Sequence, residues 1–276
     1  MAEYIIKASG EMEAFNIDKF KRSLKRIGAT ETIIQKLSQE IISLPELKTT
    51  LDIYKYAMRA LKKEQPSLAA RYNLKAALFE LGPAGFPFEQ FVSRIFGALE
   101  FRTSTGQRLR GKCVDHEIDI VIEKNNQHAI VECKFHNQHG PKTDVRVTLY
   151  TQARFQDVKA NWIKQEKKEE LHNAWLVTNT KFTTEAISYG ECIGLKLLSW
   201  NYPRNESLPE LIDRLGVHPI TALTSLSSRE KHLFMQKGFV LCKDVRKHEY
   251  LFLQLRLTKK KIGQIIEESE GICTFA

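Results

Sequence analysis

The chain has 276 residues, of which 42% are hydrophobic and 27% are charged. This composition is close to that of soluble globular proteins and excludes a disordered or a fibrous protein. The 42 Lys and Arg residues against 33 Asp and Glu residues give a net charge of +9, which suits an anionic partner such as nucleic acid.

Sequence features that bear on location are few. The apolar stretches stay well below the roughly 20 residues that cross a bilayer, and the first residues lack the pattern of a secretory signal. We therefore expect a cytoplasmic protein with no membrane partner. The five cysteines are scattered and form no Cys-x-x-Cys pair, which predicts reduced thiols rather than a disulfide framework.

The N-terminal segment is predicted to be mainly helical. Residues 4–15 indicate a short β-hairpin, after which Asn16 or Asp18 can cap a helix that runs through Ile27. Further helices are expected to begin at Thr30, Thr50 and Pro66. Two prolines and two glycines between Leu81 and Pro87 block the long helical run, so a first domain is expected over residues 1–82.

Three stretches of this segment, 6–20, 48–54 and 68–75, resemble the ATP-cone, the nucleotide-binding regulatory domain of many ribonucleotide reductases. A lysine on the hairpin and a lysine on the first helix could hold phosphates, while Thr50 caps a helix beneath the nucleotide. The resemblance implies that ATP or dATP binds through six residues: Lys7 and Lys19 at the phosphates, and Glu13, Asn16, Thr50 and Ile53 around the base and ribose.

The alternative interpretation of the N-terminal segment is a helical interaction domain that keeps the cone fold without a nucleotide. The chain contains no G-x-x-x-x-G-K-[ST] motif, so we expect nucleotide binding without hydrolysis.

The second segment, residues 83–204, alternates helices with strands and predicts a mixed α/β domain. Three helices are expected, near residues 88–99, 145–160 and 182–190. Four strands are expected, near residues 117–123, 129–135, 174–179 and 195–200.

Acidic and basic residues gather on the first two of these strands. Strict alternation over 117–123 places three isoleucines on one face and Asp119 on the other, and the next strand places Glu132 and Lys134 on one face. The turn residues at 125–126 allow a hairpin that brings Asp119 beside them. Two carboxylates next to one lysine suit Mg²⁺ or Mn²⁺, which can activate a water and neutralise charge on a phosphate.

The spacing of Asp119 and the sequence Glu132-Cys133-Lys134 resembles the D…E-x-K core of the PD-(D/E)XK nuclease superfamily. The preceding helix, with the pattern of residues 88–92, and the later segment 174–186 resemble Mrr-type restriction endonucleases. The resemblance implies that Asp119 and Glu132 hold the metal, that Lys134 serves the attacking water, and that Glu89 assists from the helix.

Other interpretations of these residues stay open. Asp115 and Glu117 are alternatives for the first metal-binding acid, and the charges could be ordinary solvent-facing residues of a two-stranded edge. Cys113-x-x-His116 and Cys133-x-x-His136 imitate a zinc set, but Cys133 points to the face opposite Glu132, which favours a simple buried thiol.

Residues 205–276 have leucines at helical spacing and predict a small helical domain, in which residues 223–244 faintly resemble a helix-hairpin-helix module.

The expected fold is thus multidomain α+β: an N-terminal helical ATP-cone with a β-hairpin cap, a central restriction-endonuclease-like domain with a mixed sheet, and a helical C-terminal domain. The expected function is metal-dependent hydrolysis of DNA phosphodiester bonds, regulated by ATP or dATP. The alternative is an inactive, nucleotide-sensing DNA-binding regulator. A homodimer or larger assembly is expected, since cutting both strands is simplest with two active sites.

Overall fold

The computed structural model describes residues 4–7, 10–44, 46–164, 171–248 and 250–273. These residues form two compact units. One unit combines the described residues up to 77 with those from 218 onward, and the other contains the described residues between 78 and 217. Within the described ranges, no helix is both long and apolar enough to span a membrane.

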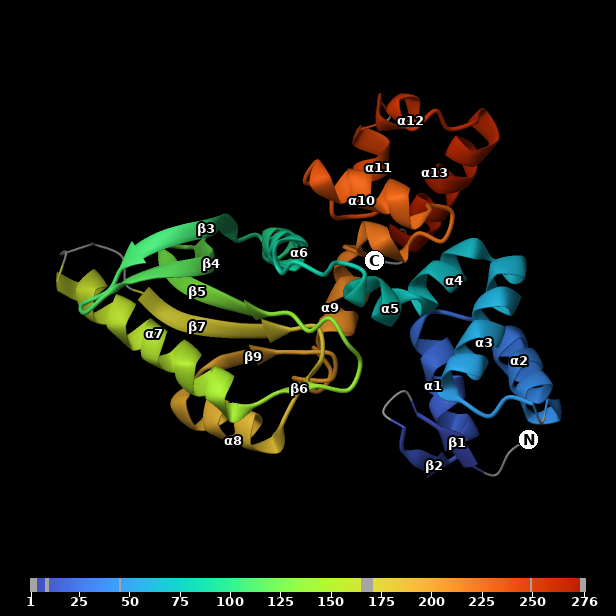
Figure 1. Ribbon diagram of the computed structural model, residues 1–276, viewed down its shortest axis with the longest axis horizontal. Helices are drawn as coiled ribbons and strands as arrows, with labels where there is room; N and C mark the ends of the chain where they lie inside the picture. The colour runs from blue at the N-terminus through green and yellow to red at the C-terminus, as the bar shows by residue number, and fades with distance from the viewer. Residues whose placement is uncertain (1–3, 8–9, 45, 165–170, 249, 274–276) are drawn as a thin grey trace. The chain divides into compact units, whose positions relative to one another are not determined.

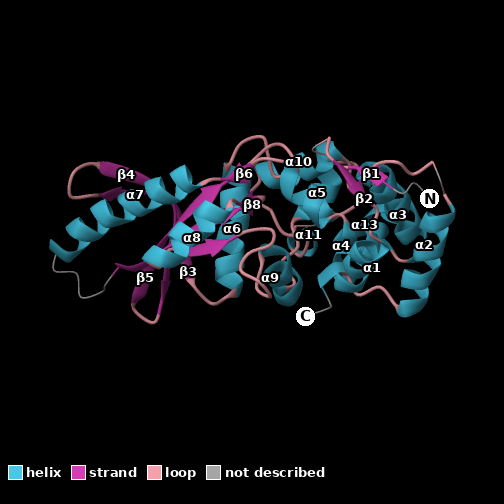
Figure 2. Ribbon diagram, turned by 90° about the horizontal axis from the view of Figure 1, so that it is seen from below, coloured by secondary structure: helices cyan, strands magenta, loops and turns pink. Residues whose placement is uncertain are grey.

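The first unit is mainly helical, with one small two-stranded sheet (Figure 2). Its N-terminal part contains β1 (Tyr4–Ile6), β2 (Met12–Ala14), α1 (Ile17–Arg26), α2 (Glu31–Ser43), α3 (Thr50–Glu64) and α4 (Pro66–Tyr72), followed by α5 (Leu74–Phe79), which crosses into the second unit. Its C-terminal part contains the short helix η1 (Ile220–Ala222), then α10 (Ser228–Gln236), α11 (Asp244–Lys247), α12 (Tyr250–Gln254) and α13 (Lys259–Cys273).

The helix starts of the N-terminal part follow the polar caps of the sequence. The side chain of Asn16 accepts a hydrogen bond from the Lys19 backbone and begins α1, and Thr30 begins α2 in the same way. The prediction that Thr50 caps the next helix is wrong. Thr49 is the extended residue, and it forms a capping box with Asp52, so Thr50 is already the first helical residue of α3.

Buried hydrogen bonds join the two parts of the first unit. Arg71 of α4 is 3% exposed and donates through Nη2 to the backbone carbonyl of Ile272 at 2.8 Å. The hydroxyl of Thr221 donates to the carbonyl of Ala77 at 2.7 Å. The N-terminal helices and the C-terminal segment therefore share one compact unit, although about 140 residues separate them in sequence.

The second unit is built on a five-stranded mixed sheet of order β3-β4-β5-β7-β9 (Figure 1). Its elements are α6 (Phe86–Ala98), β3 (Arg102–Arg110), β4 (Asp115–Lys124), β5 (Gln127–Lys134), β6 (Lys142–Thr143), α7 (Val145–Lys164), β7 (Leu171–Thr178), β8 (Lys181–Phe182), α8 (Thr184–Ile193), β9 (Lys196–Leu198) and α9 (Leu208–Leu215). The pairs β3-β4 and β4-β5 are antiparallel, whereas β5-β7 and β7-β9 are parallel. The expected mixed sheet is confirmed.

Helices cover both faces of this sheet. On one face, the ring of Phe96 from α6 meets Trp175 of β7 edge to face, with the ring centroids 5.2 Å apart. On the other face, Phe155 and Val158 of α7 pack into a buried cluster with Ile130 of β5. Figure 1 shows α7 running along the sheet with α8 beside it.

The predicted domain ranges 1–82, 83–204 and 205–276 stay a prediction. The compact units differ from these ranges in two respects. The described parts of residues 1–77 and 218–275 share one unit, and α9 belongs to the second unit, whereas the sequence groups its leucines with the C-terminal segment.

Candidate active site

Asp119 and Glu132 lie next to each other on adjacent strands. The antiparallel register pairs Ile120 of β4 with Val131 of β5. One residue further along this pair of strands, Asp119 and Glu132 therefore lie opposite each other, on the other face of the sheet. The Oδ2 atom of Asp119 accepts a hydrogen bond from the Cys133 backbone amide at 2.6 Å, which holds its carboxylate near the end of β5. The alternation of hydrophobic and acidic residues therefore places these two acids as the sequence predicts.

Glu89 of α6 adds a third carboxyl group to the same charged cluster. Burial, together with the negative charges of Asp119 and Glu117, raises the pKa of Glu89 to about 7. The pKa of Glu132 is also raised to about 7, because burial and the charges of Asp119 and Glu89 outweigh the lowering effect of Arg154 and Lys134. The three carboxyl groups are thus partly buried and interact electrostatically with one another.

Arg154 of α7 is a member of this cluster that the sequence analysis missed. Its Nη1 atom lies 2.5 Å from Oε2 of Glu132 and 2.9 Å from the carbonyl oxygen of Glu117. Its guanidinium stacks on the ring of Tyr150, 4.6 Å from the centroid, and Nη2 contacts the Tyr150 hydroxyl. The one available signal was the spacing of four residues between Tyr150 and Arg154, which aligns them on one face of a helix.

Lys134 stands at the exposed end of β5 and, with Glu132, lines a cavity of about 440 Å³. Three further basic side chains line the same cavity, His136, Lys142 and Arg146, together with the acid Asp144, which is paired with Arg146. A basic cavity beside the carboxylates is suited to a phosphate group, since Lys and Arg donate charge-assisted hydrogen bonds to phosphate oxygens.

The chain beyond Lys134 is held by a side chain from the end of β7. Asn179 accepts from the backbone amide of His136 and donates to its carbonyl, each at 2.9 Å. The ring of His136 bonds the hydroxyl of Thr143 at 2.9 Å. This clamp ties the cavity wall to two strands, and sequence reasoning gave it no role.

The donor chemistry of Glu89, Asp119 and Glu132 fits a hard divalent cation, which prefers carboxylate oxygens. Within the part of the chain that the structure describes, no three His, Cys, Asp or Glu side chains are already arranged to hold a metal ion. The reason lies in the partners of these acids: Glu132 is paired with Arg154, and Asp119 is bonded to the Cys133 amide.

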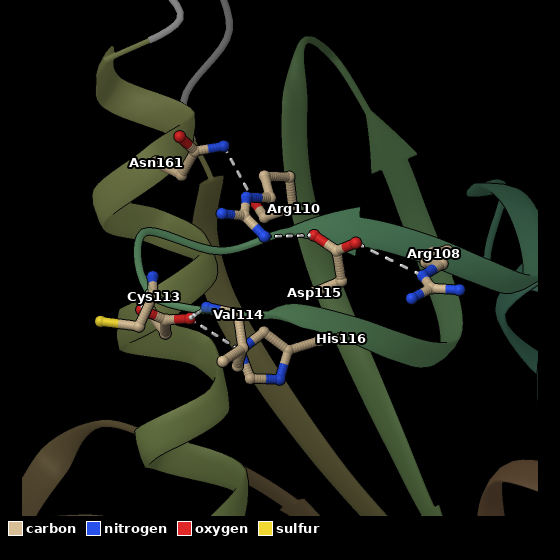
Figure 3. A network of polar contacts seen from close by, with 8 residues as sticks. Arg108, Arg110, Cys113, Val114, Asp115, His116 and Asn161 are labelled. Atoms are coloured by element: carbon tan, nitrogen blue, oxygen red, sulfur yellow. Dashed lines mark hydrogen bonds and ion pairs between the residues drawn. The ribbon is translucent and has the colours of Figure 1, made fainter.

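The alternative acids have other surroundings. Asp115 forms ion pairs with Arg110 at 2.9 Å and with Arg108 at 3.5 Å, both on β3 (Figure 3). These exposed arginines hold the pKa of Asp115 below its ordinary value. Glu117 contributes its charge to the cluster and its carbonyl to Arg154.

The imitated zinc set is explained by a different network. Asp157 of α7 accepts from the backbone amides of Cys113 and Val114, and its Oδ2 lies 2.8 Å from Nε2 of His116 (Figure 3). These contacts fasten the turn between β3 and β4 to α7. The network accounts for His116 without a metal ion.

The residues predicted to bind nucleotide fall into two groups. Around Glu13, the amines of Lys7 and Lys19 lie 2.8 Å and 2.9 Å from its two carboxylate oxygens, and their hydrogen bonds lower its pKa to about 2. Asn16 caps α1 next to Lys19. The other group is Thr50, in the first turn of α3, and Ile53, which is 6% exposed and belongs to the hydrophobic core of the unit.

Comparisons with known proteins match both the sheet domain and the C-terminal segment. The family model described as "Restriction endonuclease", the Mrr catalytic domain, matches residues 84–201, so the expected Mrr-type domain is confirmed. The model described as "AF1548-like, C-terminal" matches residues 218–273.

Two similar proteins come from these comparisons. An "Uncharacterized protein" of Archaeoglobus fulgidus is 34% identical over 182 residues, which cover 66% of this chain and 99% of that protein. The solved structure titled "Crystal Structure of Protein of Unknown Function AF1548" is 32% identical, with a TM-score of 0.55, and the match covers 72% of this chain and 100% of that one.

Proposed function

This chain belongs to the family of AF1548-like proteins, with a restriction endonuclease domain, and from this premise we propose that it is a divalent-metal-dependent DNA endonuclease. The observation that supports the proposal is the gathering of Glu89, Asp119, Glu132 and Lys134 inside the matched range. The net charge of +9 suits a DNA substrate.

In this proposal Asp119 and Glu132 hold the metal, as Mg²⁺ or Mn²⁺. When bound, the metal lowers the pKa of a water and offsets negative charge on the phosphate. Lys134, at the end of the strand that carries Glu132, orients the attacking water and donates to a phosphate oxygen. Glu89 has a raised pKa and accepts or holds a proton near neutral pH. Lys142 and Arg146 bind the DNA backbone along the cavity.

Cleavage of supercoiled plasmid tests the proposal. Wild-type protein with Mg²⁺ or Mn²⁺ is expected to nick the plasmid, and EDTA is expected to stop it. Asp119→Ala and Lys134→Ala should each lower the rate by about 100-fold or more, since each removes a group that acts on the reacting phosphate. Arg102→Gln serves as the matched control, because it removes a charge from a side chain at the start of β3 that is 83% exposed.

The alternative function is that of a DNA-binding regulator without nuclease activity. DNA binding by wild-type protein with no cleavage under any metal condition would favour it and contradict the endonuclease.

We also propose that residues 1–82 form an ATP-cone that binds ATP or dATP and regulates cleavage. The support is the pair of lysines, Lys7 and Lys19, which flank Glu13 and could exchange that carboxylate for phosphate oxygens. A cytoplasmic location, a homodimer or larger assembly, and a helix-hairpin-helix-like role for residues 223–244 belong to the same proposal.

A further inference from the structure

We propose that Arg154 is an exchangeable counter-ion of the active site: it pairs with Glu132 when no divalent cation is bound, and turns to a substrate phosphate when one is. The inference rests on the proposed endonuclease function. It assigns to Arg154 two effects of opposite sign, opposing metal binding and favouring cleavage.

The first step of the argument is the burial of the ion pair. The side chains of Arg154 and Glu132 are 12% and 18% exposed, and their closest atoms are 2.5 Å apart. By contrast, Arg146 of the same helix, which pairs with Asp144 just before the helix begins, is 86% exposed. Solvent screens an exposed pair but leaves a buried pair strong, so Arg154 is a real competitor for the Glu132 carboxylate.

The second step is the position of the guanidinium. The Oε2 atom of Glu132 that bonds Arg154 belongs to a carboxylate that the proposed function assigns to the metal. A dication on either oxygen of this carboxylate would stand close to the guanidinium, and the two cations would repel each other. Binding of the dication therefore weakens the Arg154–Glu132 pair.

The third step is that two contacts remain when Glu132 is given up. Arg154 still has the carbonyl of Glu117 at 2.9 Å and the ring of Tyr150 beneath its plane. These contacts keep the guanidinium near the cavity, because Tyr150 lines it together with Glu132 and Lys134. A displaced Arg154 would thus stay next to Tyr150, within reach of a phosphate bound in the cavity.

The fourth step is an unused donor. The Nε atom of Arg154 is buried and has no hydrogen-bond partner among the described residues. Buried polar atoms are normally paired, so an unpaired donor in this cluster needs an explanation. A phosphate oxygen is a suitable partner, because the planar guanidinium offers donors to phosphate in a forked geometry.

The test is calorimetric titration of the full chain with Mn²⁺, without DNA, for wild type, Arg154→Gln, Arg154→Lys, Asp119→Ala and Arg102→Gln. Arg154→Gln is expected to bind Mn²⁺ at least about 5-fold more tightly than wild type, since one repelling charge is gone. At saturating Mn²⁺ the same variant is expected to cleave plasmid about 10-fold or more slowly, since a phosphate donor is lost. Arg102→Gln removes the same charge at an exposed site and should match wild type in both measurements.

Arg154→Lys separates charge from geometry. It keeps the positive charge, so its Mn²⁺ affinity should stay near that of wild type, while its cleavage should fall because the forked donor is missing. Circular dichroism checks that each variant is folded, and Arg154→Met, which keeps the apolar stem, replaces Arg154→Gln if the latter does not fold.

The outcomes distinguish a failure of the counter-ion role of Arg154 from a failure of the proposed endonuclease function. If wild type binds Mn²⁺, Asp119→Ala does not, and Arg154→Gln binds equally or more weakly, the metal site stands and the counter-ion role of Arg154 is overturned. Wild type that shows no Mn²⁺ binding at all would overturn the metal-dependent function and the inference with it.

Discussion

The clustering of the candidate site residues follows from alternation along strands, whereas the position of their cationic partner does not. Asp119, Glu132 and Lys134 could be predicted because a strand with period two fixes which side chains share a face. Arg154 lies 22 residues from Glu132 in sequence and reaches it from a helix on the sheet face. Its part in the site depends on how α7 docks, which no local pattern determines.

The raised pKa of Glu89 has a consequence for stability in the metal-free protein. Its value in the folded state is about 7, above the ordinary 4.5, so between these pH values the folded state holds more protons than the unfolded state. The contribution of Glu89 to the free energy of unfolding is therefore lost as pH rises from about 4.5 to 7. Glu89→Gln, which stays neutral, should match wild type near pH 5 and become more stable than wild type by pH 8.

Urea denaturation in EDTA at several pH values measures this difference. Glu206→Gln, which changes a carboxylate that is 69% exposed and paired with Arg214, is the matched control and should show no such trend. An unchanged difference between Glu89→Gln and wild type from pH 5 to pH 8 would contradict the assignment.

Among the elements, β3 is the strand of the five-stranded sheet that sequence reasoning missed. Its residues 102–110 are polar and basic with little apolar alternation, because β3 is an edge strand paired with β4 alone. The C-terminal end of β3 is held by the turn that follows it, because Asp157 binds that turn to α7. Hydrophobic periodicity identifies strands that bury a face, so an exposed edge strand gives a weak signal.

The element α13 depends on a buried carboxylate that periodicity also cannot reveal. Glu268 is 2% exposed, and its two oxygens accept from the backbone amides and hydroxyls of Thr224 and Ser225 at 2.5–2.9 Å. Glu268→Gln replaces one acceptor oxygen with a donor that faces other donors. The free energy of unfolding should fall by about 2–4 kcal/mol, since hydrogen bonds to a charged group are lost in a buried place.

Chemical denaturation of the full chain checks this loss against Glu267→Gln, an exposed neighbour on the same helix. The control should change the free energy of unfolding by less than about 0.5 kcal/mol. Equal stability of the two variants would mean that Glu268 does not hold α13 in place.

At the scale of the whole molecule, the sequence predicts which segments are helical but not which segments assemble. Arg71 and Ile272 are far apart in the chain, and their hydrogen bond joins the N-terminal helices to the AF1548-like C-terminal segment in one unit. A nucleotide bound by Lys7 and Lys19 would therefore stabilise a unit to which both ends of the chain contribute. A ligand at 100 times its Kd adds about 2.7 kcal/mol to the stability of the state that binds it.

The last prediction uses this linkage to test the proposed cone. ATP or dATP should raise the melting temperature of the wild-type chain, and calorimetry should show binding that weakens by about 10-fold or more in Lys7→Ala and in Lys19→Ala, since each loses a charge-assisted contact to phosphate. Lys25→Ala, in the last turn of α1, is the matched control and should bind as wild type does. Wild type that neither binds nor is stabilised would identify the N-terminal helices as an interaction module. In that case the Lys7–Glu13–Lys19 cluster would be a set of surface ion pairs, whose removal changes stability little.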